Sequence, residues 1–155
     1  MLADEPTTAL DATVQIQVLL LLRELQRDLG LSIIFVTHDI GAAVEVADRI
    51  AVMYAGQIVE QASARDLIRN PRHPYTLGLL KSRADGAMVK GARLEAIPGA
   101  PPDLANLPDG CPFAPRCFLA DATCTTGTVE MQELGPSHQA RCRRLAQTDR
   151  LQPAL

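Results

Sequence analysis

The sequence contains no tryptophan, few other aromatic residues and no excess of basic side chains. Only two tyrosines and three phenylalanines are present, and 15 Lys and Arg residues are set against 18 Asp and Glu residues. A protein that binds nucleic acid needs a basic surface for the phosphates and commonly stacks aromatic side chains on the bases. We therefore expect no nucleic acid among the partners of this chain.

Long apolar runs are also lacking. Runs such as Val18–Leu22 are far shorter than the roughly 20 residues that a membrane-spanning helix needs. The first residues, Met1–Pro6, contain neither the basic segment nor the apolar segment of a secretory signal. These absences predict a soluble chain of the cytoplasm.

Proline and cysteine are almost confined to the second half of the chain. Ten of the 11 prolines lie at or after Pro71, and all four cysteines follow Gly110. The earlier residues are typical of packed secondary structure, and the later ones of loops with short helices. We place a boundary near residue 70, which divides the chain into residues 1–70 and 71–155.

Apolar residues between positions 11 and 29 recur at helical spacing. Asp11 is a suitable residue to cap the start of this helix, and Gly30 to end it. Additional apolar residues widen the stripe and predict that the helix is covered on more than one side: Ile16, Leu19 and Leu20.

The following segments predict a layered α/β fold. Residues 32–37 form a β-branched and aromatic run, which favours a strand buried on both faces in a parallel sheet. A short helix over 40–47 follows. Two strands over 49–54 and 57–61, joined at Ala55-Gly56, then predict a hairpin.

Acidic residues and a histidine follow the first two predicted strands. Asp4 and Glu5 come directly after Leu2 and Ala3, and His38 ends the run over 32–37. In a parallel sheet these side chains would meet at one edge, where ligands bind. One carboxylate there can hold Mg²⁺ through water, and the other can polarise a water that attacks a phosphoryl group. The alternative is an acidic surface turn with a histidine that caps a helix.

The segment over residues 2–11, LADEPTTALD, is followed by a helix and then by IIFVTHD over 33–39. This arrangement closely resembles the second half of an ATP-binding-cassette (ABC) ATPase, over about residues 1–62. The resemblance covers the Walker B aspartate, the catalytic glutamate, the D-loop and the switch histidine. It implies ATP and Mg²⁺ as cofactors.

The resemblance assigns a role to each of four residues. Asp4 would hold Mg²⁺ through water, and Glu5 would be the general base for the hydrolytic water. His38 would contact the γ-phosphate of ATP. Asp11 would lie where two ATPase subunits meet in a dimer and help to position the water across it.

Other motifs of that family are missing. The sequence has no Gly-x-x-x-x-Gly-Lys-Ser/Thr phosphate loop, no Leu-Ser-Gly-Gly-Gln signature and no recognisable glutamine loop. In the family these motifs precede the position of Asp4. We therefore expect a C-terminal remnant of a longer ATPase that does not hydrolyse ATP by itself.

The segments NPRHPYT over residues 70–76 and IPGAPP over 97–102 resemble the C-terminal extension of oligopeptide and dipeptide importer ATPases. His73, beside two prolines, is expected to be structural. The resemblance implies a peptide importer with a second ATPase subunit, transmembrane permease subunits and, indirectly, a peptide-binding protein outside the membrane. It places the chain at the cytoplasmic face of the cell membrane.

Four cysteines form the second candidate site: Cys111, Cys117, Cys124 and Cys142, separated by five, six and 17 residues. Disulfides are disfavoured in a reducing cytoplasm. Structural zinc sites commonly use Cys-x₂₋₄-Cys pairs, and none occurs here. An iron–sulfur cluster tolerates wider spacings, so the residues leave zinc and a cluster open.

The resemblance to the peptide importers implies a [4Fe–4S] cluster at these cysteines, with zinc as the alternative. Neighbouring arginines could offset thiolate charge: Arg116, Arg141, Arg143 and Arg144. His138 is a conceivable substitute ligand, although we expect an exposed loop histidine.

The predicted fold is thus the C-terminal portion of a parallel-sheet ABC ATPase core, residues 1–70, and a small loop-rich extension with a four-cysteine site, residues 71–155. The predicted function is the ATP-hydrolysing subunit of a peptide importer. The alternative is a non-catalytic, metal-stabilised interaction module left by truncation of such a subunit. A pure binding module would not need Asp4, Glu5 and His38.

Overall fold

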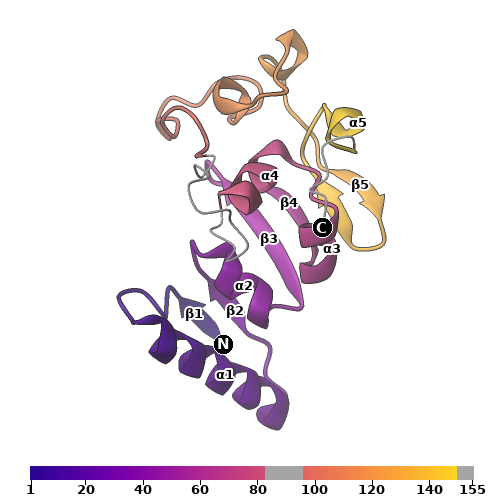
Figure 1. The fold of residues 1–155 in the computed structure, drawn as a ribbon. Coiled ribbons are helices and arrows are strands. Elements are labelled where there is room, and N and C mark those ends of the chain that lie inside the picture. Colours follow the sequence, from indigo (N-terminus) through magenta and orange to yellow (C-terminus); the bar gives the residue numbers. More distant parts are fainter. Residues whose placement is uncertain (83–95, 150–155) are drawn as a thin grey trace, which may run out of the picture. The chain divides into compact units, whose positions relative to one another are not determined.

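The computed structural model describes residues 1–82 and 96–149 and divides into two compact units, Met1–Asp48 and Arg49–Leu155 (Figure 1). The first unit contains four elements: β1 (Leu2–Asp4), α1 (Ala12–Leu29), β2 (Ile34–Val36) and α2 (Ile40–Val46). The mixture of helices and sheets fits the predicted α/β class. No helix of the described residues has the length and apolarity to cross a membrane.

The long helix of the first unit begins and ends at the predicted residues. The Asp11 carboxylate accepts hydrogen bonds from the backbone N–H groups of Thr13 and Val14, each at 3.0 Å. Gly30 ends α1 in the left-handed conformation, with φ at 63°. Both caps satisfy backbone groups that a helix terminus otherwise leaves unpaired.

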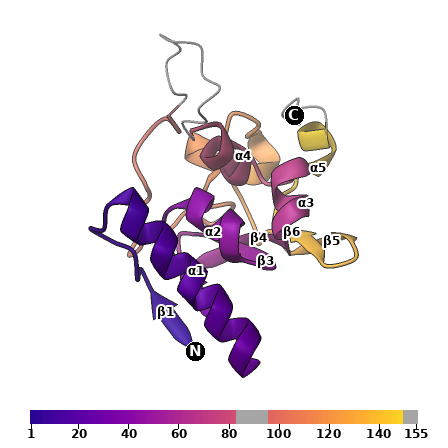
Figure 2. The same cartoon turned by 60° about the horizontal axis from the view of Figure 1, so that its bottom comes forward.

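Strands β1 and β2 pair in parallel, with Asp4 opposite Val36. The prediction that this sheet is buried on both faces is wrong for the described residues, because Ile34 is 67% exposed and Val36 is 44% exposed. The physical reason is that the sheet has two strands, and Figure 2 shows the long helix α1 beside β1. Two strands form too small a surface for a two-sided core.

The prediction that α1 is covered on more than one side is also wrong, because few elements of the first unit pack against it. Ile16 and Leu20 are exposed, and Leu19 is the residue of the predicted stripe that becomes deeply buried. The short helix α2 packs on α1 and is too small to cover its remaining apolar side chains.

The second unit is built on an antiparallel sheet in the order β3-β4-β6-β5. Its strands are β3 (Arg49–Tyr54), β4 (Gln57–Ser63), β5 (Gln132–Gly135) and β6 (His138–Ala140). Its helices are α3 (Ala64–Arg69), α4 (Pro74–Lys81) and α5 (Leu145–Thr148), with 3₁₀ turns at Ala114–Arg116 and Ala122–Cys124. The composition boundary at residue 70 lies inside this unit, because β4 pairs with β6 far along the chain.

The predicted hairpin is confirmed as β3 and β4. Ala55 and Gly56 between them both have positive φ, at 48° and 75°. Positive φ at both central residues is the geometry of the two-residue turn whose twist matches paired antiparallel strands.

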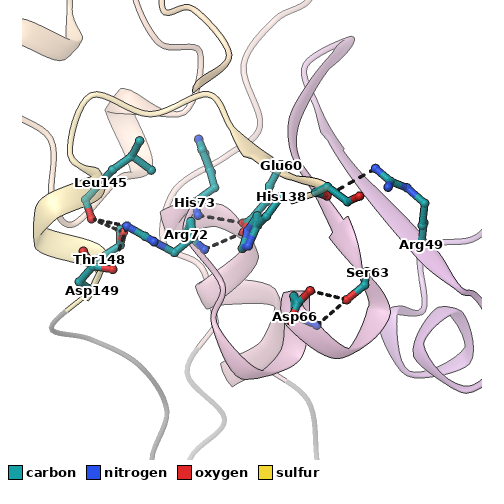
Figure 3. A network of polar contacts seen from close by, with 11 residues as sticks. Arg49, Glu60, Ser63, Asp66, Arg72, His73, His138, Leu145, Thr148 and Asp149 are labelled. Carbon is teal, nitrogen blue, oxygen red and sulfur yellow. Dashed lines mark hydrogen bonds and ion pairs between the residues drawn. The ribbon is translucent and has the colours of Figure 1, made fainter. Parts of the chain in front are cut away.

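A buried carboxylate joins three segments of the second unit (Figure 3). Glu60 on β4 is 0% exposed. It accepts hydrogen bonds from the backbone N–H of Arg72 at 2.7 Å, from that of His73 at 2.8 Å, and from Nε2 of His138 at 2.8 Å. The expectation of an exposed loop histidine at position 138 is wrong, because His138 begins β6 and pairs with this carboxylate.

Aromatic rings pack the hairpin and α4 against the extension. The ring centroids of Tyr54 and Tyr75 are 4.7 Å apart, and Phe113 lies 5.2 and 5.3 Å from them. Phe113 is almost fully buried. Such contacts bury large apolar surfaces, so Phe113 anchors the start of the cysteine-bearing segment.

Arg116 fastens the proline-rich segment 97–102 to this cluster. Its guanidinium donates to the backbone carbonyls of Pro98 at 2.8 Å and Ile97 at 3.2 Å, and to the Tyr54 hydroxyl at 3.3 Å. It also lies over the Tyr54 ring, 6.0 Å from the centroid. The Ile97 side chain meets α4 at Gly78, where a Cβ would come within 2.8 Å of it.

We expect Glu60→Gln to lower the free energy of unfolding by about 1–3 kcal/mol, because an amide nitrogen would face a buried backbone N–H donor. Urea unfolding of the full chain measures the change. Glu130→Gln, at an exposed position of the same unit, is the matched control and should change little. Equal stability of the two variants would contradict the role of Glu60.

Candidate functional site

The first candidate site lies at the carboxyl end of the parallel strands. Asp4 ends β1, Glu5 follows it, and His38 follows β2. The backbone N–H of Glu5 donates to the carbonyl of Val36 at 2.9 Å, so the strand pairing continues to the edge. The Glu5 Oε1 and His38 Nδ1 atoms are 3.1 Å apart. The structure therefore brings Glu5 and His38 together, as the parallel-sheet prediction requires.

Glu5 is held in a defined orientation. Its φ of 43° is in the left-handed region, which residues other than glycine rarely adopt and which is enriched at functional sites. The Thr8 hydroxyl donates to the Glu5 Oε2 atom at 2.9 Å. Each carboxylate oxygen thus has its own partner, one from His38 and one from Thr8.

These partners also affect ionisation. The hydrogen bond from His38 lowers the pKa of Glu5, and the hydrogen bond from Thr8 lowers it further. Glu5 is therefore ionised at neutral pH and can accept a proton. Thr8 was not predicted from the sequence, although a hydroxyl three residues after a carboxylate that enters a turn is a recognisable local signal.

The other two predicted site residues, Asp4 and Asp11, differ in their side-chain contacts. The Asp4 side chain is exposed, and no hydrogen bond involves it within the described residues. Asp11 uses its Oδ1 atom to cap α1. No hydrogen bond within residues 1–82 and 96–149 joins Asp11 to Glu5 or His38. The carboxylate of Asp4 is thus exposed to solvent, whereas one carboxylate oxygen of Asp11 is occupied by the cap of α1.

The second candidate site is a small cavity in the second unit, of about 10 Å³. All four predicted cysteines line it: Cys111, Cys117, Cys124 and Cys142. All four are free thiols. A cavity of this size accommodates about one water molecule, so the thiols line a compact space.

Backbone N–H groups point at the sulfur atoms of this cavity. The N–H of Arg144 donates to the Cys142 sulfur at 3.2 Å, and that of Leu119 donates to the Cys117 sulfur at 3.4 Å. Such donors stabilise thiolates. The site was predicted from the cysteine pattern, but these backbone donors have no signal in sequence spacing.

Gly110 allows two of the cysteine segments to meet. The N–H of Cys111 donates to the carbonyl of Cys124 at 2.9 Å. A Cβ at Gly110 would lie 2.3 Å from that carbonyl oxygen. A side chain at this position would therefore force the two segments apart.

Burial raises the pKa of the thiols. It raises the pKa of Cys117 to about 11 and that of Cys142 to about 12, and neighbouring thiols add to both effects. Burial also raises the pKa of Cys111. These thiols are therefore protonated at neutral pH in the structure as it stands.

The arginines of this region bind carbonyl oxygens and one carboxylate instead of thiolates. Arg143 donates to the backbone carbonyls of Thr126, Gly127 and Thr128 at 2.8, 3.2 and 2.9 Å, and to that of Thr123. Arg141 donates to the carbonyls of Ile58 and Val129, and Arg144 pairs with the Asp121 carboxylate. They connect loop segments that have few backbone partners of their own.

Within residues 1–82 and 96–149, no group of three or more His, Cys, Asp or Glu side chains is arranged to hold a metal ion. The four cysteines thus line one cavity but are not arranged around a single ion, so this arrangement supports neither the predicted cluster nor the zinc alternative. The absence of a Cys-x₂₋₄-Cys pair, which brings two thiolates to one ion, is a physical reason. The cysteines remain predicted ligands.

Residues 59–124 match the family model described as the C-terminal region of the oligopeptide/dipeptide transporter. The chain is 50% identical over 144 residues to an oligopeptide transport ATP-binding protein of Mycobacterium tuberculosis, covering 92% of this chain and 23% of the relative. It is 53% identical over 144 residues to a dipeptide transport ATP-binding protein of Bacillus subtilis, covering 92% and 42%. A Brucella ovis protein named as a peptide import ATP-binding protein is 48% identical over 147 residues, with 92% and 44% covered. The chain spans less than half the length of each of these relatives.

We expect His38→Ala to raise the pKa of Glu5, because it removes the main cause of the lowered value. A lowered pKa in the folded state stabilises the fold above the unfolded pKa, and this contribution disappears as pH falls through the folded pKa. In the variant this contribution is smaller, and its loss is complete at a higher pH than in the wild type. A ¹³C NMR titration of the Glu5 carboxyl group measures it.

Thr8→Ser retains a hydroxyl and is the matched control, in which the pKa of Glu5 should stay lowered. An unchanged pKa in His38→Ala would show that the pair with Glu5 is not formed in solution.

Proposed function

We propose that this chain, which is similar to peptide import ATP-binding proteins over most of its length, is part of an ABC importer ATPase and contributes the hydrolytic residues of a subunit that couples ATP hydrolysis to peptide import. The observation that carries the proposal is the contact between Glu5 and His38 at the carboxyl edge of the parallel strands. Asp4 is exposed at the same strand end.

Glu5 acts as the general base. It is ionised, its two oxygens are oriented by His38 and Thr8, and it is open to solvent. A carboxylate in this state accepts a proton from a water that attacks the terminal phosphorus of ATP. Because the two hydrogen bonds lower its basicity, its contribution comes chiefly from position and not from a raised pKa.

His38 and Asp4 act on the phosphate side. With Nδ1 donating to Glu5, the opposite ring nitrogen of His38 can donate to a phosphate oxygen when the ring is protonated. The exposed carboxylate of Asp4 offers the hard oxygen atoms that Mg²⁺ prefers, and would hold the ion through water. The ion, when bound, neutralises charge on the phosphates.

The partners follow from the same proposal. No phosphate loop occurs in this sequence, so we do not propose that these residues alone cradle the phosphates. Asp11 would lie at the contact with a second ATPase subunit. Transmembrane permease subunits would receive the conformational change that ATP hydrolysis causes in the ATPase subunits. A peptide-binding protein outside the membrane would be an indirect partner. The subunit would lie at the cytoplasmic face of the membrane, with residues 1–70 in the ATPase domain and 71–155 as its extension.

We also propose that the four cysteines hold a [4Fe–4S] cluster. Three observations support the donor set: all four thiols are free, they line one cavity, and backbone N–H groups donate to two of the sulfurs. A cluster binds each thiolate to a different iron, so its ligands need not surround one ion. The alternative of a non-catalytic module would retain this site and dispense with Glu5.

We expect Glu5→Gln to abolish ATP turnover in the complete importer subunit and to leave ATP binding intact, because the proton acceptor alone is lost. The loss should be at least about 100-fold, the lower range for general-base catalysis. Steady-state phosphate release and equilibrium nucleotide binding measure the two effects. Glu45→Gln, an exposed carboxylate on α2, is the control. Unchanged turnover in Glu5→Gln would remove Glu5 from the mechanism and favour the non-catalytic alternative.

We expect chain purified without oxygen to contain iron and to absorb visible light, because sulfur-ligated iron is coloured. Elemental analysis and absorption spectroscopy measure this. Cys111→Ser should lower the iron content, whereas Thr126→Ser, on an exposed loop beside the cavity, should not. Absence of both iron and zinc in the wild-type chain would exclude a metal at the cysteines.

A further inference from the structure

The cysteine cavity contains a histidine that the proposed function does not use. His73 lines it together with the four cysteines and is 1% exposed. Its backbone N–H is bound by Glu60, and its ring points away from that carboxylate (Figure 3). The ring of Phe113 packs on it, with the centroids 5.8 Å apart. The imidazole is thus held in place from two sides.

The start of helix α4 fixes which ring nitrogen carries the proton. The backbone N–H of Tyr75 donates to Nδ1 of His73 at 3.1 Å, so that His73 caps the helix. A nitrogen that accepts a hydrogen bond has no proton of its own, and the neutral ring must carry its proton on Nε2. His73 is therefore a fixed N–H donor.

This N–H group, Nε2–H of His73, makes no side-chain hydrogen bond to residues 1–82 and 96–149. The terminal nitrogens of Arg143, which also lines the cavity, are occupied by backbone carbonyls. Arg144 pairs with Asp121, although its own Nε is buried without a partner. The hydrogen-bond acceptors of the cysteine side chains that line the cavity are their sulfur atoms.

We propose that Nε2–H of His73 donates a hydrogen bond to a sulfur of the four-cysteine site when that site holds its iron–sulfur cluster. This inference rests on the cysteine site of the proposed function. His73 is a positioning and tuning residue and not a ligand, because its Nδ1 is occupied by the helix cap and its Nε2 is protonated. A hydrogen bond to a ligand sulfur stabilises the more negative, reduced cluster and raises its reduction potential.

Two substitutions separate this role from the helix cap. Asparagine is a good N-cap residue and can replace the Nδ1 acceptor, but its side chain is too short to place a donor where Nε2 lies. Glutamine reaches that position with its amide N–H and is a poor cap. His73→Asn thus removes the donor, and His73→Gln retains it.

The experiment is a spectroscopic redox titration of the full chain after anaerobic reconstitution with iron and sulfide. We expect His73→Asn to bind as much iron as the wild type and to show a lower midpoint potential. His73→Gln should stay near the wild-type value. An unchanged potential in His73→Asn, or an equal shift in both variants, would overturn the inference and leave the cluster proposal intact. If the wild-type chain binds no iron, both fail.

A measurement on the wild-type chain does not depend on the folding of a variant. With ¹⁵N-labelled histidine, the reconstituted chain should show a His73 ring with a proton on Nε2 and none on Nδ1. The Nε2 proton should shift when the cluster is reduced. A proton on Nδ1, or an Nε2 resonance insensitive to reduction, would contradict the proposed hydrogen bond.

Discussion

The fully buried carboxylate of Glu60 is the interaction on which the second unit depends. A carboxylate removed from water is costly unless hydrogen bonds replace the lost solvation. Here two backbone N–H groups and His138 supply them. Because these donors come from segments 12, 13 and 78 positions along the chain, the carboxylate fixes the turn before α4 and the start of β6. The same turn presents His73 to the cysteine cavity.

The first unit has no comparable centre. Its sheet has two strands, and several apolar side chains of α1 and β2 are exposed. Its polar edge is nevertheless well defined, because Glu5, Thr8 and His38 are joined by local hydrogen bonds and by the pairing of β1 with β2. Exposed apolar surface of this kind normally lies against other protein. The edge that carries Glu5 and His38 is thus ordered by a few directional contacts and not by a core.

Features set by short-range rules were predictable from the sequence. The caps of α1, the hairpin turn at Ala55-Gly56 and the meeting of Glu5 with His38 follow from local chemistry and from parallel strand order. Contacts between distant segments were not predictable. Nothing in the sequence pairs Glu60 with His138, because the pairing depends on where β6 joins the sheet. The burial of β2 was overestimated. An apolar run indicates that a strand can be buried on both faces, but it does not indicate whether other elements pack on those faces.

The cysteine segment is organised by polar contacts in place of a large apolar core. Arginine side chains bind loop carbonyls, backbone N–H groups bind sulfurs, and Gly110 lets two segments touch. Metal binding at these thiols would have to remove protons, because burial raises the pKa of Cys117 to about 11 and that of Cys142 to about 12. Metal affinity should therefore weaken as pH falls. The hydrogen bonds already aimed at the sulfurs reduce the cost of deprotonation, and a fixed donor on His73 would act in the same direction.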